Sequence, residues 1–183
     1  MIKVPKFFHD ILGEETRGYA IGLITLTTAL IMGYLMVEEG ELFVASGTIA
    51  GVIGFILLAD IIAGTVANFT KGTNNFYAKR ALNRWIFIAI HVQPVIISWL
   101  LGFNMTHAVI VWLFTILAAV IVNLMMGKSY QREVAGTFMA LGIFLSVVLY
   151  MGVSMVALTM GIFFSIKVIY SFAVDHEREE QDD

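Results

Sequence analysis

The sequence predicts an all-α, polytopic integral membrane protein: a six-transmembrane-helix bundle built as three hairpins with short outside turns. Its composition is the first reason, because 59% of the 183 residues are hydrophobic and only 14% are charged, far from the balance of a soluble domain. The second reason is that the apolar residues form runs of about 20, the length that crosses the hydrocarbon core of a bilayer. The third is that lysine and arginine gather in alternate connections between these runs.

Residues 1–17 precede the first apolar run and are expected to form an amphipathic cytoplasmic segment. Pro5 is followed by Phe7, Phe8, Ile11 and Leu12, a spacing that places apolar side chains on one face of a short helix. Such a helix either lies in the membrane interface or covers the inner end of the bundle, and the sequence favours neither. No small-residue cleavage pattern follows the first run, so we interpret it as a retained span and not as a signal peptide.

Residues 18–36 and 42–68 form the first predicted hairpin, around an acidic turn at residues 37–41. Small residues recur at four-residue spacing in the second span, which lets neighbouring helices approach closely in lipid. They form three sets: Gly47 with Gly51, Ala50 with Gly54, and Ala59 with Ala63 and Ala67. We therefore expect the second span to lie at the centre of the bundle.

The second predicted hairpin follows a polar, basic connection at residues 70–84 and comprises residues 85–103 and 107–126. Pro94 lies inside the first of these spans. Because proline has no backbone N–H, it leaves the carbonyl of Ile90 without its usual partner and predicts a kink.

The third hairpin is predicted within residues 134–174, which are apolar apart from Lys167. About forty residues make two spans if a tight turn forms at residues 152–154. One long tilted helix, giving five spans, is the alternative.

The distribution of basic residues favours six spans. With six spans, ten of the eleven lysines and arginines fall on one side, and the opposite turns carry none. By the positive-inside rule, this side is cytoplasmic, and both termini lie there in a cytoplasmic-membrane protein. The transmembrane domain then covers residues 18–174, followed by an acidic cytoplasmic tail at residues 175–183. The ten residues are Lys3, Lys6, Arg17, Lys71, Lys79, Arg80, Arg84, Lys128, Arg132 and Arg178.

Three ionisable residues, Asp60, His91 and Lys167, lie within predicted spans. Each lies about seven or eight residues from the cytoplasmic end of its helix, or roughly 10 to 12 Å deep at about 1.5 Å per residue. Charged groups inside membranes usually face the protein interior and pair with one another. One interpretation is a proton- or cation-handling cluster at the floor of a cytoplasmic cavity. The others are a structural Asp60–Lys167 ion pair, with His91 hydrogen-bonded nearby, and a lone Lys167 that reaches to the headgroups.

Further polar residues suggest a path and a surface. Arg84, His91 and Ser98 recur near helical spacing on the third span, with Gln93 pointing away, and Asn123 marks the inner half of the fourth. Arg84, Ser98 and Asn123 are thus path-lining candidates, although close helix contacts explain them equally well. Anionic lipid headgroups, or a phosphorylated ligand, are candidate partners for the basic connection, through Lys71, Lys79, Arg80 and Arg84. Positive-inside topology alone explains the same residues.

The sequence excludes several kinds of site. It has no cysteine, which removes disulfides and thiolate metal sites. We expect no metal, no haem or other cofactor and no nucleic-acid partner, because the histidines lie at unmatched depths and no binding or catalytic motif is present.

The sequence leaves three functions open. Translocation of an ion or small solute with proton coupling through Asp60, His91 and Lys167 is the first. A non-catalytic subunit or scaffold of a larger membrane complex, or a homo-oligomer, is the second, since small-residue faces suit helix association. The third function, an enzyme that acts on lipid, is the least favoured of the three. The sequence therefore favours a protein that is not an enzyme.

Overall fold

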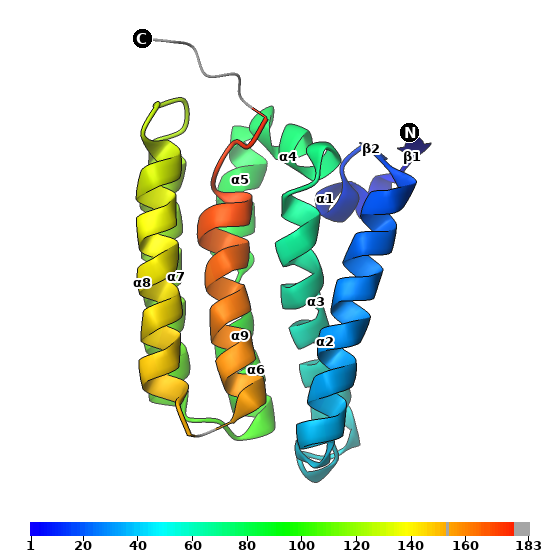
Figure 1. The fold of residues 1–183 in the computed structure, drawn as a ribbon, viewed down its shortest axis with the longest axis vertical. Helices are drawn as coiled ribbons and strands as arrows, with labels where there is room; N and C mark the ends of the chain where they lie inside the picture. The colour runs from blue at the N-terminus through cyan, green and yellow to red at the C-terminus, as the bar shows by residue number, and fades with distance from the viewer. Residues whose placement is uncertain (153, 178–183) are drawn as a thin grey trace.

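The computed structural model describes residues 1–152 and 154–177. In this part of the chain, six helical segments are long and apolar enough to cross a membrane, and they stand side by side (Figure 1). The predicted all-α bundle of six spans is therefore confirmed. Of the predicted acidic tail, only residues 175–177 lie within the described chain. The spans are α2 (Gly18–Ala45), α3 (Thr48–Asn68), α5 with α6 (Ala81–Ile90 and Gln93–Leu101), α7 (Met105–Leu124), α8 (Gln131–Tyr150) and α9 with η2 (Met155–Ser165 and Ile166–Phe172).

The N-terminal segment packs against one end of the bundle. Strand β1 (Ile2–Lys3) pairs with β2 (Glu15–Thr16). The chain between the two strands forms η1 (Lys6–Phe8) and α1 (His9–Leu12). Short helix α4 (Lys71–Ala78) holds the segment: Tyr77 donates a hydrogen bond to the carbonyl of Asp10 (3.0 Å), and Thr73 donates to Ile11 (2.9 Å). Burial raises the pKa of Tyr77, and the charge of Asp10 adds to the effect, so this phenol remains a donor at neutral pH.

The first hairpin turns later than expected. Within the predicted turn at residues 37–41, two helical segments of α2 meet at a sharp bend at Glu39 (φ −135°, ψ 25°). The chain reverses only at Ser46 and Gly47, before α3 begins. Gly47 has φ +88°, a conformation that favours glycine. The prediction is therefore correct for the position of the bend and wrong for the position of the reversal. Glu39 at the bend is held by a partner distant in sequence, the start of α9.

The third span is broken near its middle. Helix α5 ends at Ile90, α6 starts at Gln93, and His91 between them has non-helical geometry (φ −80°, ψ 72°). Pro94 occupies the first turn of α6, where its missing N–H costs no hydrogen bond. The predicted kink is therefore confirmed, and it is a complete break.

The last two spans are separate helices that pack closely. Helix α8 ends at Tyr150 and α9 begins at Met155, so the predicted turn is confirmed and the five-span alternative is wrong. A methyl group added at Gly142 would meet the Ser165 hydroxyl oxygen at 2.8 Å, and one added at Gly161 would meet that of Ser146 at the same distance. The sixth span is the most deeply buried of the six, and not the second as expected. The small residues of α3 do allow close contacts, since Gly51 lies against α2, Gly54 against α6 and Gly64 against η2. However, α9 and η2 are enclosed by α3, α7 and α8.

Candidate functional site

The centre of the candidate site is an ion pair between α3 and η2. The Nζ atom of Lys167 lies 2.7 Å from Oδ2 of Asp60 and 3.3 Å from the main-chain carbonyl oxygen of the same residue. Gly64, one turn beyond Asp60 on α3, leaves the space that the Lys167 side chain occupies. Lys167 lies in the π-helical turn η2, a widened helix geometry that is common at functional sites.

The two partners of this ion pair differ in exposure. The side chain of Lys167 is 3% exposed, whereas that of Asp60 is 44% exposed. The ammonium group is therefore enclosed by protein, whereas the carboxylate reaches the surface of the bundle.

Gln93 is a third member of the site, donating a hydrogen bond from Nε2 to Oδ2 of Asp60. A continuous helix would direct Gln93 away from the face that carries His91. The break at His91 and Val92 changes the helical phase, and Gln93 turns toward α3 as a result. The adjacent Pro94 could have indicated this orientation, because a helix break at a proline changes the direction in which all following side chains point.

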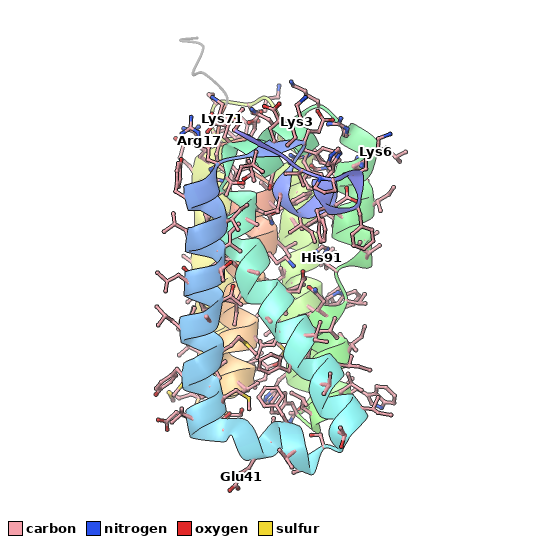
Figure 2. The ribbon with its side chains drawn as sticks, turned by 90° about the vertical axis from the view of Figure 1, so that its right-hand side faces the viewer. Lys3, Lys6, Arg17, Glu41, Lys71 and His91 are labelled. Atoms are coloured by element: carbon pink, nitrogen blue, oxygen red, sulfur yellow. The ribbon has the colours of Figure 1, made fainter. Side chains whose placement is uncertain are left out.

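His91 lies at the end of α5, next to the break, and Figure 2 shows it below the N-terminal segment. Its ring is buried and stacks on Phe87 with centroids 3.8 Å apart, and Nδ1 makes a hydrogen bond with the Phe87 carbonyl. Phe87 in turn lies under Lys167, whose Nζ is 6.0 Å from the ring centroid. Asp60 and Lys167 thus contact each other directly, and His91 joins them through Phe87.

The broken helix also contributes polar backbone to this region. The carbonyl of His91 accepts a hydrogen bond from Nε1 of Trp112 on α7 (2.9 Å). In a membrane, non-helical backbone persists only where such partners satisfy it or where it lines a cavity. The site therefore combines a break in one span, a π-helical turn in another, and a paired carboxylate between them.

Of the three path-lining candidates, Arg84 and Asn123 lie together in the structure and Ser98 lies elsewhere. Arg84 is 2% exposed and donates from Nε to Oδ1 of Asn123 (2.6 Å) and from Nη2 to the carbonyl of Ala173 (2.7 Å). Gln131, which sequence reasoning missed, donates to the same Ala173 carbonyl (3.0 Å). Arg84 and Asn123 thus belong to one buried network. Ser98 is also buried, but it lies on α6 beyond the break and outside this network.

The four basic residues predicted to contact anionic headgroups do not all lie at one site. Lys71, Lys79 and Arg80 border a cavity between the N-terminal segment, α2, α3 and α4, whereas Arg84 faces the bundle interior. Lys71 pairs with Glu177 (3.2 Å), and Arg80 pairs with Glu14. Contact with anionic headgroups therefore remains a prediction for the first three residues alone.

Within the described residues, no group of three or more histidine, cysteine, aspartate or glutamate side chains could hold a metal ion. No protein-family model, curated protein or solved structure matches this chain.

Proposed function

We propose that this multi-pass membrane protein translocates an ion or small solute, and that Asp60 is the residue that exchanges a proton or cation during transport. The observation that supports this most strongly is the asymmetry of the ion pair: an accessible carboxylate bound to an enclosed ammonium group. Exchange of a proton or cation needs a carboxylate that is not enclosed, whereas an ion pair that only holds helices together does not.

The proposed chemistry is competition for the Asp60 carboxylate. A proton or cation that binds the carboxylate weakens its attraction to Lys167, and the ammonium group keeps only the Asp60 carbonyl, 3.3 Å away. An ammonium group with a lost partner in a low-dielectric interior is costly. Binding at Asp60 is thereby coupled to movement of η2 against α3, and the break at His91 offers a hinge beside it.

A structural role for the same pair is the competing function. One observation favours this structural role: Gln93 and Lys167 both donate hydrogen bonds to Oδ2 of Asp60. These bonds link α3, α6 and η2 and fix their positions relative to one another. A subunit or scaffold of a membrane complex would use the pair in this way.

Flux measurements test the transport proposal. Purified protein is placed in vesicles that contain a pH-sensitive dye, and proton movement is followed under an imposed Na⁺ or K⁺ gradient. We expect cation-dependent proton flux in the wild type and its loss in Asp60→Asn. Glu41→Gln, which removes a carboxylate at the opposite end of the bundle (Figure 2), is the matched control and should keep the flux.

Stability measurements test the competing proposal that the Asp60–Lys167 pair is structural. Asp60→Asn, Lys167→Met and the double variant are compared by thermal unfolding in detergent. If each single variant is destabilised, the double variant regains what each loses, and the wild type shows no cation-dependent flux, the pair is structural and the transport proposal is wrong.

A further inference from the structure

A second site of different chemistry lies at the end of the bundle that carries the N-terminal segment. A cavity of about 820 Å³ is enclosed by this segment, the start of α2, the end of α3 and α4. This volume falls within the range of small-molecule sites, about 300–1,000 Å³. The cavity does not include Asp60, His91 or Lys167, so it is separate from the proposed transport site.

The polar wall of this cavity carries four basic side chains: Arg17, Lys71, Lys79 and Arg80. Three carboxylates, those of Glu14, Glu15 and Glu177, also border it. Lys71 and Arg80 are paired with Glu177 and Glu14 respectively. Within the described residues, Arg17 and Lys79 form no ion pair, and Arg17 donates only to the Tyr19 hydroxyl (3.0 Å). Two cations are therefore available to an anion.

Further hydrogen-bond donors surround the same cavity. Its wall includes the N-terminal turn of α4, where Thr70 donates its hydroxyl to the Ala67 carbonyl (2.7 Å) and does not cap the helix. Free N–H groups at a helix start favour anions. Thr16 also borders the cavity; it is 2% exposed, and its hydroxyl has no hydrogen-bond partner among the described residues.

Part of the cavity lining is apolar, and some of these residues also lie on exposed faces of the bundle. Ala20, Val66 and Phe69 contribute to it. Tyr19, Leu23 and Phe69 border the cavity and are also exposed on the outside of the bundle, by 63%, 52% and 43%. A ligand with a charged head can therefore occupy the polar wall while its tail lies along α2 and α3 in the bilayer.

We infer that this cavity binds the phosphate headgroup of an anionic phospholipid, with an acyl chain along Leu23 and Phe69. Basic pockets between spans at a membrane surface recognise such headgroups. The shared chemistry is a phosphate ester, which a soluble phosphate compound could also supply. The apolar wall favours the lipid, because burial of each CH₂ group adds to affinity.

Binding measurements in detergent distinguish these sources. The probes are dioctanoyl phosphatidylglycerol, dioctanoyl phosphatidylcholine and glycerol 3-phosphate, each titrated while thermal unfolding is followed, and native mass spectrometry counts bound lipids. We expect saturable stabilisation and one bound molecule with phosphatidylglycerol alone. Saturation by glycerol 3-phosphate at equal affinity, or equal binding of phosphatidylcholine, would overturn the proposal.

A matched pair of double variants tests the location. Arg17→Gln with Lys79→Gln removes the two available cations and should weaken binding roughly 30-fold, at about fivefold for each basic residue near an anionic lipid. Lys6→Gln with Lys128→Gln removes the same charge outside the cavity and should leave affinity within about twofold. Equal losses in both would assign binding to the general surface charge and reject the cavity.

Discussion

At the scale of single residues, Gly64 determines whether the Asp60–Lys167 pair can form. A methyl group at this position would collide with Cε of Lys167 and lie 2.9 Å from its Nζ. The lysine cannot move aside into solvent, because its side chain is 3% exposed. The absence of a side chain at position 64 is therefore part of the site.

Gly64→Ala is expected to lower the free energy of unfolding by about 1–3 kcal/mol, the usual cost of overpacking. Thermal unfolding in detergent measures it. Gly33→Ala on α2 is the control, since a methyl group there meets nothing within 4 Å and should be neutral or stabilising by about 0.5–1 kcal/mol. Indistinguishable melting temperatures for the two variants would show that Lys167 does not pack over Gly64.

At the scale of elements, Glu39 joins the first and sixth spans. Its carboxylate accepts hydrogen bonds from the main-chain N–H groups of Met155 (2.8 Å) and Val156 (3.0 Å) and from the Ser154 hydroxyl (2.7 Å). A carboxylate at the start of a helix satisfies free N–H groups and interacts favourably with the helix dipole. The kink in α2 at Glu39 places this carboxylate at the start of α9.

Glu39→Gln should destabilise the protein by about 1–2 kcal/mol, because the amide loses the charge and one acceptor oxygen. The change is measured by thermal unfolding, with Glu41→Gln as the control. Glu41 is exposed, and its side chain points away from the bundle in Figure 2. If Glu41→Gln were as destabilising as Glu39→Gln, the effect would come from the charge of the turn and not from α9.

At the scale of the whole molecule, the two ends of the bundle differ in charge. The N-terminal segment, α4, the connection between α7 and α8, and the end of η2 share one end (Figure 1). Lysine and arginine gather at that end, as the labels on Lys3, Lys6, Arg17 and Lys71 in Figure 2 illustrate. We propose that this end is cytoplasmic, following the positive-inside rule.

Because the chain has no cysteine, single cysteines can report this orientation without background labelling. Glu41→Cys and Ser129→Cys place exposed thiols at opposite ends of the bundle. In intact cells, a membrane-impermeant maleimide should label Glu41→Cys and leave Ser129→Cys unlabelled until the cells are permeabilised. The reverse pattern would invert the proposed orientation.

The sequence by itself determined the number of spans and their approximate positions. These depend on the length and apolarity of each run, which the bilayer imposes locally on every helix. It also singled out Asp60 and Lys167, because an ionisable residue in an apolar run stands out without any knowledge of its neighbours. The break near Pro94 was also predictable from the sequence, because a proline disrupts the helix in which it lies and needs no partner elsewhere.

Only the tertiary structure decided which side chains meet. Gln93 reaches Asp60 because the break in the third span rotates α6, and the carboxylate of Glu39, at the bend of α2, binds the start of α9. Arg84 is a basic residue of the connection in the sequence and a buried partner of Asn123 in the fold. Such contacts depend on how separate helices rotate and cross, and small residues permit many of these arrangements while specifying none.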